Sequence, residues 1–376
     1  MAGTLKGLRI IEIAGIGPGP FCAMMLADHG AEVIRVDRPE GDPLSANPLA
    51  RSRKSIAIDI RKPEGAAVVR DLAKNADGLI EGNRPGVMER LGLGPDALLK
   101  ENEKLVYGRM TGWGQTGPLA GAAGHDINYI SLAGVLHGCG RADGPPTPPV
   151  NYLGDFGGGG MLLAFGMVSA LLAVKNGAPG QVIDCAMTDG SALLTTMIWG
   201  MRAQGVWRDE RGANLLDTGA HFYNTFRTRD GAWISIGSIE PKFYALLRDK
   251  LGLQARPEFD AQMDRAHWPA LTEELRAIFL TKTRAQWCDL LEGTDVCFGP
   301  VLSMAEAPDH PHNAARRTFT DVGGVTQPAP APRFSASRER TPTPPRAIGA
   351  DTDEILMLAG CDAERIGSLR RAGIVR

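Results

Sequence analysis

The first 110 residues of this chain alternate short apolar segments with helical ones, and this order limits the possible folds more than any other feature. Segments such as Leu8–Ile13 and Leu105–Met110 are short and mainly apolar, as buried strands are. Apolar strands separated by helices are typical of a parallel sheet. The sequence therefore predicts an α/β fold. The expected strands are residues 8–13, 32–36, 55–60, 78–81, 105–110 and 181–184, and the expected helices are 20–29, 63–74, an apolar stretch from 161, and 191–203.

After residue 205 the pattern changes to that of a smaller α+β unit. Asp230-Gly231 lies between two strand-like segments, Asn224–Thr228 and Ala232–Gly237, which is a strong hairpin signal. Helical stretches follow at 241–251, about 267–282 and 284–291, and prolines at 328, 330, 332, 342, 344 and 345 indicate an extended linker. We therefore expect a large domain over residues 1–205, a small domain over 206–322, and a linker that returns the chain to the large domain over 323–376.

The composition is that of a soluble protein with a large core, since 43% of the 376 residues are hydrophobic and 22% are charged. The net charge of −2 gives no global attraction to nucleic acid or to an anionic membrane. The longest apolar run, Met161–Val174, has 14 residues, which is short for a membrane span. Six dispersed cysteines without a CxxC pair indicate reduced thiols. Because neither a signal peptide nor a peroxisomal address is seen, we expect a cytoplasmic protein. From the net charge and the short apolar run, we expect it to bind no nucleic acid and no membrane.

Two polar residues stand beside glycines in the middle of the chain. His125 lies in the motif Gly124-His125-Asp126-Ile127-Asn128-Tyr129, and Asp155 lies in the glycine-rich stretch 154–160. We interpret the second as a loop that opens an apolar helix, where free N–H groups and the helix dipole converge. The hypothesis is that His125 and Asp155 are proton-transfer groups facing one carbon. Each also has a common structural explanation, because a histidine beside glycine is often structural and an aspartate before a helix is often an N-cap.

The turn Gly15–Pro20 imitates a dinucleotide-binding fingerprint, with Asp37 where a ribose-binding acid would stand. Pro20 occupies the place of the third glycine, and Pro18 and Pro20 lack N–H groups that a pyrophosphate would use. We therefore interpret this segment as a rigid turn between a strand and a helix.

Basic residues cluster between positions 35 and 62 of an otherwise neutral chain. Such a cluster is usually a solvated face, but this one falls near strand ends of an α/β sheet, where ligands bind. A phosphate-bearing ligand therefore stays open as an alternative. The cluster consists of Arg35, Arg38, Arg51, Arg53, Lys54, Arg61 and Lys62.

Seven motifs in this sequence carry a family resemblance, namely residues 8–20, 34–39, 81–86, 111–118, 124–129, 154–160 and 351–354. In this order they resemble the class III CoA-transferase superfamily over nearly the whole chain. The similarity is greatest to the branch that racemises 2-methylacyl-CoA thioesters. The resemblance implies an interlocked homodimer, in which each subunit has a Rossmann-like large domain and a smaller α+β domain. It also implies that a CoA thioester binds between the large domain of one subunit and the small domain of the other.

The resemblance also assigns roles to matching positions. His125 and Asp155 would be the two proton-transfer residues, and Glu240 of the small domain would reach His125 across the dimer. Arg38 would contact the adenine–phosphate end of CoA, and Arg90 would add charge. The nucleotide would be held by Ile58, Asp59, Ile60, Arg61, Gly82, Asn83 and Arg84, and the acyl end would be lined by Gly124, Asp126, Ile127, Asn128 and Tyr129.

The residue types suit this chemistry. Inverting a carbon next to a thioester requires removal of its proton on one face and return of a proton on the other. Neutral imidazole suits one face, and a carboxylate whose pKa is raised suits the other. One positioned acid or base contributes roughly 10²–10⁴ in rate. The enolate oxygen therefore also needs fixed donors, and we expect these to be the N–H groups of Asp155 to Gly160. We expect no metal and no separate cofactor, because CoA is part of the substrate.

The main alternative is transfer of CoA between carboxylic acids, in which Asp155 would be a nucleophile that forms an acyl anhydride. His125 stands where transferases usually lack a histidine, and the glycine loop typical of many transferases is not seen near residues 237–240. Both features favour the racemase. A non-enzymatic CoA-binding protein on this scaffold would be expected to have lost one of the two proton-transfer residues.

Overall fold

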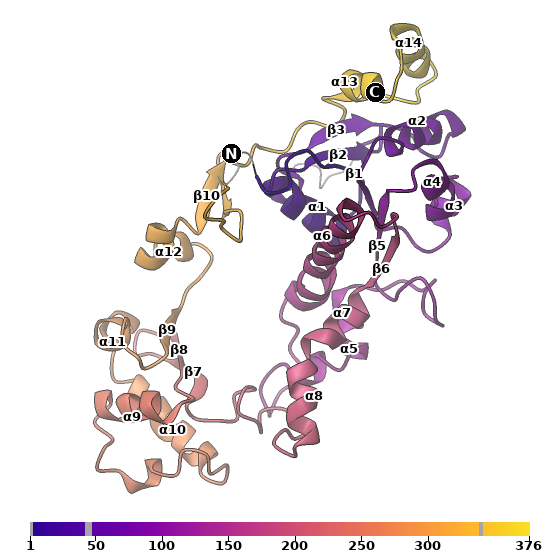
Figure 1. Ribbon diagram of the computed structural model, residues 1–376. Helices are drawn as coiled ribbons and strands as arrows, with labels where there is room; N and C mark the ends of the chain where they lie inside the picture. The colour runs from indigo at the N-terminus through magenta and orange to yellow at the C-terminus, as the bar shows by residue number, and fades with distance from the viewer. Residues whose placement is uncertain (1–2, 42–46, 338–340) are drawn as a thin grey trace. The chain divides into compact units, whose positions relative to one another are not determined.

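The structure is a computed structural model that describes residues 3–41, 47–337 and 341–376. The described chain forms two compact units, which are coloured along the sequence in Figure 1. The first unit comprises the chain up to Ala133, Pro149–Thr195 and Arg317–Arg376, and the second comprises Gly134–Pro148 and Thr196–Arg316.

The segment Gly134–Pro148, assigned from the sequence to the large domain, packs with the second unit. Arg141 donates hydrogen bonds to Asn224 at 2.6 Å and to Thr225 at 2.7 Å. Arg211 donates in turn to the carbonyl oxygen of Arg141 at 3.0 Å. These contacts are hydrogen bonds of polar side chains, so the hydrophobic periodicity of the sequence does not reveal that the segment belongs to the second unit.

Six parallel strands form the sheet of the first unit, in the order β3-β2-β1-β4-β5-β6. This confirms the predicted α/β fold with its parallel sheet. The strand order reverses between β1 and β4, and the loops that follow these strands diverge, which leaves a crevice at their carboxyl ends. The strands are β1 (Arg9–Ile13), β2 (Glu32–Asp37), β3 (Lys54–Ala57), β4 (Gly78–Glu81), β5 (Val106–Thr111) and β6 (Val182–Ala186).

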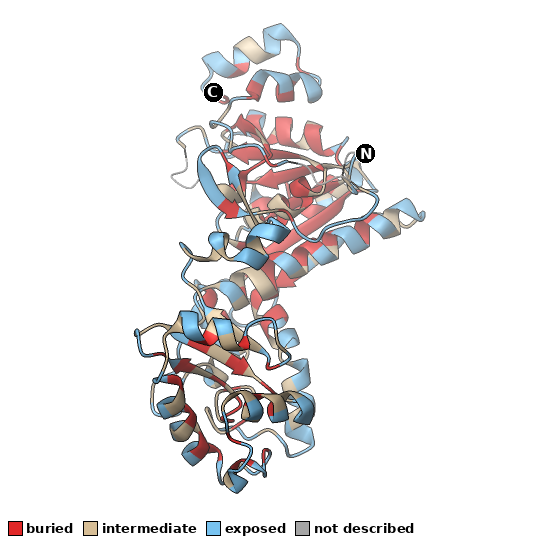
Figure 2. Cartoon of the chain, turned by 90° about the vertical axis from the view of Figure 1, so that its left-hand side faces the viewer, coloured by how far each residue is buried: buried red, intermediate tan, exposed pale blue. Residues whose placement is uncertain are grey.

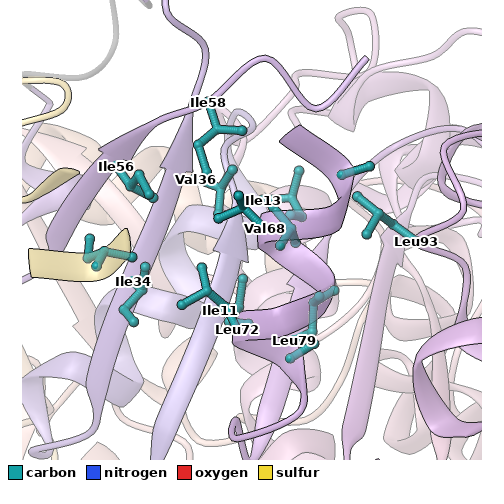
Figure 3. Packing of buried hydrophobic residues seen from close by; sticks show 14 of the residues in the cluster. Ile11, Ile13, Ile34, Val36, Ile56, Ile58, Val68, Leu72, Leu79 and Leu93 are labelled. Carbon is teal, nitrogen blue, oxygen red and sulfur yellow. The ribbon is translucent and has the colours of Figure 1, made fainter. Parts of the chain in front are cut away.

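Helices cover both faces of this sheet (Figure 2). Strands β1 to β5 are almost wholly buried, whereas the edge strand β6 is partly exposed. On one face, Val68 and Leu72 of α2 (Pro63–Ala73) belong to one apolar cluster with Ile11 and Ile34 of the strands (Figure 3). On the other face lie α1 (Pro18–Asp28) and α6 (Leu162–Lys175). Full burial of one such side chain contributes roughly 1.5–3 kcal/mol. The remaining helices of this unit are α3 (Val87–Arg90), α4 (Pro95–Glu101), α5 (Asp126–Leu132), α7 (Met187–Leu194), α13 (Thr352–Leu358) and α14 (Ala363–Arg371).

The segment expected to be a glycine-rich loop is instead a π-helix, η3 (Tyr152–Met161), which continues directly into α6. The interpretation of Asp155 as a residue ahead of the helix is therefore wrong, because it lies inside η3. The glycines allow η3 to cross α7 closely. A Cβ atom on Gly190 would lie 1.8 Å from the carbonyl oxygen of Gly158, and one on Gly158 would lie 2.6 Å from the nitrogen of Ser191. This close crossing outweighs the low helix propensity of glycine.

Together η3 and α6 form a helix of 24 residues, Tyr152–Lys175, which is long and apolar enough to cross a membrane. The apolar run counted from the sequence was shorter because it left out the glycine-rich turns. The apolar core helix of a soluble protein meets the same criteria, and Leu163, Met167 and Leu171 of this helix lie in the core of the first unit. The length and composition of this helix are therefore weak evidence that it crosses a membrane.

The second unit is built on an antiparallel sheet in the order β7-β8-β9. Its first two strands form the hairpin predicted around Asp230-Gly231, which is confirmed by the pairing of Tyr223–Arg227 with Trp233–Gly237. The third strand was not predicted, and Pro300, which lies in it, weakens its local strand signal. The helix expected over 191–203 is two helices, α7 and α8, which meet at Thr195. The elements are α8 (Thr196–Ala203), β7 (Tyr223–Arg227), β8 (Trp233–Gly237), α9 (Pro241–Lys250), α10 (Trp268–Phe279), α11 (Arg284–Leu291), β9 (Phe298–Val301) and α12 (Pro311–Arg316).

The expected linker begins with a second hairpin, so its first residues are not extended coil. β10 (Phe319–Val322) pairs antiparallel with β11 (Val325–Pro328). Gly323 and Gly324 form the turn with φ angles of 65° and 83°, a left-handed conformation that favours glycine in two-residue hairpin turns. Because of the prolines that follow, this segment was assigned from the sequence to an extended linker, so the hairpin was not predicted.

Candidate active site

A cavity with a volume of about 560 Å³ lies at the carboxyl ends of β1, β4 and β5. It coincides with the reversal of strand order, where open α/β sheets bind their ligands. Its walls are the turn Gly15–Pro20 after β1, residues 82–85 after β4 and residues 112–113 after β5. The remaining lining residues include His125 at the start of α5 and Asp155 of η3. The two predicted proton-transfer residues therefore line one cavity.

Asp155 is half-buried, and three groups fix its position in η3. Its backbone N–H donates to Oδ1 of Asp126 at 2.7 Å, and Nδ2 of Asn151 donates to its Oδ2 at 3.0 Å. On the opposite side, a Cβ atom on Gly17 would lie 3.4 Å from Oδ2 of Asp155. The expectation that the Asp155 N–H faces an enolate oxygen is therefore wrong, because this N–H already donates its hydrogen bond to Asp126.

The surroundings of Asp155 act on its pKa in both directions. Burial raises the pKa of Asp155, and the neighbouring negative charge of Asp126 adds to this rise. The hydrogen bond from Asn151 and the charge of His125 lower it, but the net direction is upward. Raising the pKa of a carboxyl group brings it nearer to working pH, which suits a group that must both release and accept a proton.

His125 precedes α5, and its side chain is exposed to the cavity. Its backbone N–H donates to Oδ1 of Asn128 at 3.1 Å, and its carbonyl oxygen accepts the N–H of Asn128 at 2.8 Å. The carbonyl oxygen of Gly124 accepts a hydrogen bond from the hydroxyl of Tyr129. Both sides of His125 are therefore held by the first turn of α5.

A buried network holds the loop that follows β4. Oε2 of Glu81 accepts the N–H of Asn83 at 2.6 Å, and Oε1 accepts Nε of Arg109 at 2.9 Å. Arg109 also pairs with Glu89 at 2.7 Å. Burial raises the pKa of Glu81, and the Asn83 and Arg109 contacts oppose this rise. Arg84, which directly follows Asn83, lines the cavity.

Of the residues predicted from the sequence, a first group lies together on the cavity wall: Gly82, Asn83, Arg84, Gly124, His125, Tyr129 and Asp155. A second group lies outside the lining of this cavity in the part of the chain that is described: Arg38, Ile58, Asp59, Ile60, Arg61, Arg90, Asp126, Ile127 and Asn128.

The second group has other contacts. Ile58 belongs to the apolar core. Arg61 pairs with Asp59 at 2.7 Å and with Glu40 at 2.5 Å. Glu240 lies in the second unit, where it precedes α9. The contacts of these residues with CoA stay predictions.

Sequence reasoning missed three features of the site. The turn Gly15–Pro20, rejected as a dinucleotide site, forms a wall of the cavity beside Asp155. Trp113 lines the cavity as well. Asn151 holds the Asp155 carboxylate, and the signal for it was an amide side chain four residues earlier, about one helical turn away. Within the described ranges, no group of three or more His, Cys, Asp or Glu side chains has the arrangement of a metal site.

Comparisons with known proteins agree with this geometry. The family model described as CoA-transferase family III matches residues 5–352. An alpha-methylacyl-CoA racemase of Mus musculus is 45% identical over 99% of this chain and 97% of its own length. That of Homo sapiens is 43% identical with the same coverage. The crystal structure of a CAIB/BAIF family protein from Brucella suis superimposes with a TM-score of 0.83 at 26% identity, over 96% of this chain and 100% of the other.

Proposed function

This chain belongs to the CoA-transferase family III, and we propose from that premise that it interconverts the (R) and (S) forms of 2-methylacyl-CoA thioesters. One observation supports this most directly: His125 and Asp155 lie on the lining of the same cavity. The high identity to racemases of mouse and human supports it as well. The reaction is an isomerisation, so it needs no acceptor and no redox partner.

Two proton transfers account for the reaction. One of the two residues removes the α-proton, and the electron pair of the C–H bond moves into an enolate of the thioester. The other residue delivers a proton to the opposite face of the same carbon, which inverts it. Reaction in the other direction exchanges the two roles, so each residue must hold a proton in one direction and lack it in the other.

The raised pKa of Asp155 supports its part in this scheme. A carboxyl group with an ordinary pKa would be almost wholly ionised near neutral pH and a poor proton donor. Burial and the charge of Asp126 raise the pKa of Asp155, whereas Asn151 steadies its ionised form. The group is thereby suited to both roles. His125 lies on the lining of the same cavity and supplies the second proton-transfer group.

The CoA moiety would be held by cations at the rim of the sheet. Arg84 lines the cavity and is exposed. Arg38 and Arg90 are exposed and free to contact phosphate groups, which bind guanidinium groups well. Arg61 would have to share its charge with Asp59 and Glu40. We therefore rank Arg84 and Arg38 above Arg61 as phosphate ligands.

The proposal includes a homodimer in which Glu240 of one subunit reaches His125 of the other. Support comes from an apolar stripe along η3 and α6, formed by Met161, Phe165, Val168 and Leu172, which are 53%, 72%, 40% and 60% exposed. These residues follow helical spacing, and exposed apolar stripes of this kind mark interaction surfaces. A cytoplasmic location is also proposed, and the six free cysteines support it.

CoA transfer with Asp155 as the nucleophile is the second candidate, and the description of the family favours it. A nucleophilic carboxylate must be ionised, and burial acts against ionisation of Asp155. The presence of His125 on the same cavity gives the racemase a second proton-transfer group that an anhydride mechanism does not need.

One experiment separates the two reactions. The purified protein is incubated in D₂O with one enantiomer of a 2-methylacyl-CoA, first alone and then with a free carboxylic acid. A racemase incorporates deuterium at the α-carbon and forms the other enantiomer without the acid. Transfer of CoA to the acid, with no deuterium at the α-carbon, would show that the protein is a CoA-transferase and would favour Asp155 as its nucleophile.

A further inference from the structure

The peptide that joins Gly124 to His125 is held at both of its polar groups by side chains of α5. Its carbonyl oxygen accepts a hydrogen bond from the hydroxyl of Tyr129. Its N–H donates to Oδ1 of Asn128 at 3.1 Å. The next carbonyl oxygen, that of His125, accepts the N–H groups of Asn128 at 2.8 Å and Tyr129 at 3.3 Å. The backbone on either side of the His125 Cα atom is therefore fixed to one helical turn.

Tyr129 is packed so that its hydroxyl has little freedom. The side chain is buried, and its ring meets that of Trp113 edge-on with 4.8 Å between centroids. A Cβ atom on Gly112 would lie only 2.1 Å from the Tyr129 ring. A Cβ atom on Gly124 would lie 2.8 Å from Tyr129 and 3.0 Å from Trp113. Gly124 is thus enclosed by two aromatic rings directly before His125.

The hydroxyl is also kept in the form that donates. Burial raises the pKa of Tyr129, the negative charge of Asp155 raises it further, and the charge of Arg84 opposes this. A phenol with a raised pKa remains protonated throughout the range in which imidazole titrates. The hydrogen bond to Gly124 therefore persists at working pH.

We propose that Tyr129 is a positioning residue for His125, and that Asn128 holds the other side of the same peptide. Rotation of this peptide would turn the imidazole away from the cavity, and the Tyr129 hydroxyl prevents it. This inference rests on the proposed function of His125 in proton transfer. Asp155 is positioned separately, by Asn151 and Asp126. Loss of the Tyr129 hydroxyl should therefore affect one face of the α-carbon and not the other.

The test is the substitution Tyr129→Phe, which removes one oxygen and keeps the ring. Tyr107→Phe is a matched control, because the buried Tyr107 hydroxyl donates to the carbonyl oxygen of Leu93 at 2.9 Å and lies outside the cavity lining. Deuterium exchange at the α-carbon is measured separately from the (R) and (S) forms of one 2-methylacyl-CoA, together with kcat and KM. Small displacements of a catalytic group cost up to about 10²-fold in rate.

For Tyr129→Phe we expect kcat to fall by about tenfold with little change in KM, because the imidazole is displaced but the CoA contacts are kept. Exchange should slow mainly from one enantiomer. Tyr107→Phe should keep both exchange rates. Equal slowing from both enantiomers would overturn the inference, since the hydroxyl would then act on the shared enolate. No slowing, or the same asymmetry in Tyr107→Phe, would overturn it too.

A second pair of variants guards against misfolding of Tyr129→Phe. Asn128 is exposed, so its replacement leaves the core intact. Asn128→Ala removes the acceptor for the His125 N–H, whereas Asn128→Asp keeps one. The inference expects enantiomer-selective slowing in Asn128→Ala and recovery in Asn128→Asp, and symmetric rates in both would overturn it. If the unaltered protein exchanges neither enantiomer, the proposed racemase function itself fails and takes this inference with it.

Discussion

The carboxylate of Asp126 accepts the backbone N–H of Asp155, with 2.7 Å between Oδ1 and the nitrogen. Asp126 directly follows His125 and begins α5, so this bond joins the helix beside one proton-transfer residue to the helix that contains the other. Oδ2 of Asp126 has no hydrogen-bond partner among the described residues, and the residue is only 6% exposed. The bond therefore also places a buried carboxylate beside the half-buried Asp155.

Replacing Asp126 with Asn should lower the pKa of Asp155. The amide keeps an acceptor for the Asp155 N–H but removes the negative charge that favours the protonated form. His125 and Asn151, which both lower this pKa, remain in place. In the pH profile of kcat, the limb that reports Asp155 should move to lower pH. A limb that stays in place, or moves to higher pH, would show that the charge of Asp126 does not act on Asp155.

Replacing Asn151 with Ala should move the same limb in the opposite direction. The Asn151 amide donates to Oδ2 of Asp155 at 3.0 Å and thereby favours its ionised form. Without it the pKa of Asp155 should rise further, so the limb moves to higher pH. Asn102→Ala is the control, because Asn102 donates to the carbonyl oxygens of Ala73 and Ala76 at 2.9 Å each, away from the cavity. The control should leave the profile unchanged, and a shift in both variants would indicate a general loosening of the fold.

Replacing Gly154 with Ala should damage the site directly. The added Cβ atom would lie 2.5 Å from Oδ1 of Asp126, so the carboxylate or η3 must move. We expect a loss of kcat of up to about 10²-fold and a loss of stability of about 1–3 kcal/mol. Gly200→Ala is the matched control, because its Cβ atom meets nothing within 4 Å in α8, and it should stabilise by about 0.5–1 kcal/mol. Urea unfolding and kcat measure both effects, and near-wild-type kcat in Gly154→Ala would contradict the described packing.

The parallel sheet could be predicted because buried strands leave a local signal. All six expected strands overlap β1 to β6, since each is a short apolar run bounded by turn residues. The π-helix could not be predicted in this way. Four consecutive glycines indicate a loop by propensity, and their helical conformation depends on the close crossing of Gly158 with Gly190 of α7, which is 32 residues away. A tertiary contact of this kind has no local signature.

The residues of the candidate site also differ in whether a local sequence signal or only a tertiary contact reveals them. His125 and Asp155 were identified by their glycine-rich contexts together with a family resemblance. The turn that contains Gly17 was rejected as a binding site because the prolines beside Gly17 argue against a pyrophosphate. Nothing in the sequence indicated that Gly17 lies close to Asp155, because the two residues are 138 positions apart. The role of Asp126 was also missed, because its carboxylate turns away from the cavity toward the Asp155 backbone. Sequence motifs identify reacting groups more readily than the residues that hold them.

The central claim is that His125 and Asp155 serve opposite faces of one carbon, and exchange by single-base variants tests it most directly. His125→Ala and Asp155→Ala are each incubated in D₂O with the (R) and (S) forms of a 2-methylacyl-CoA. A variant with one remaining base can exchange only the proton on its own face, without inversion. We predict that both variants lose interconversion and that each retains exchange from a different enantiomer. Retention of interconversion in either variant, or exchange from the same enantiomer in both, would contradict the two-base account.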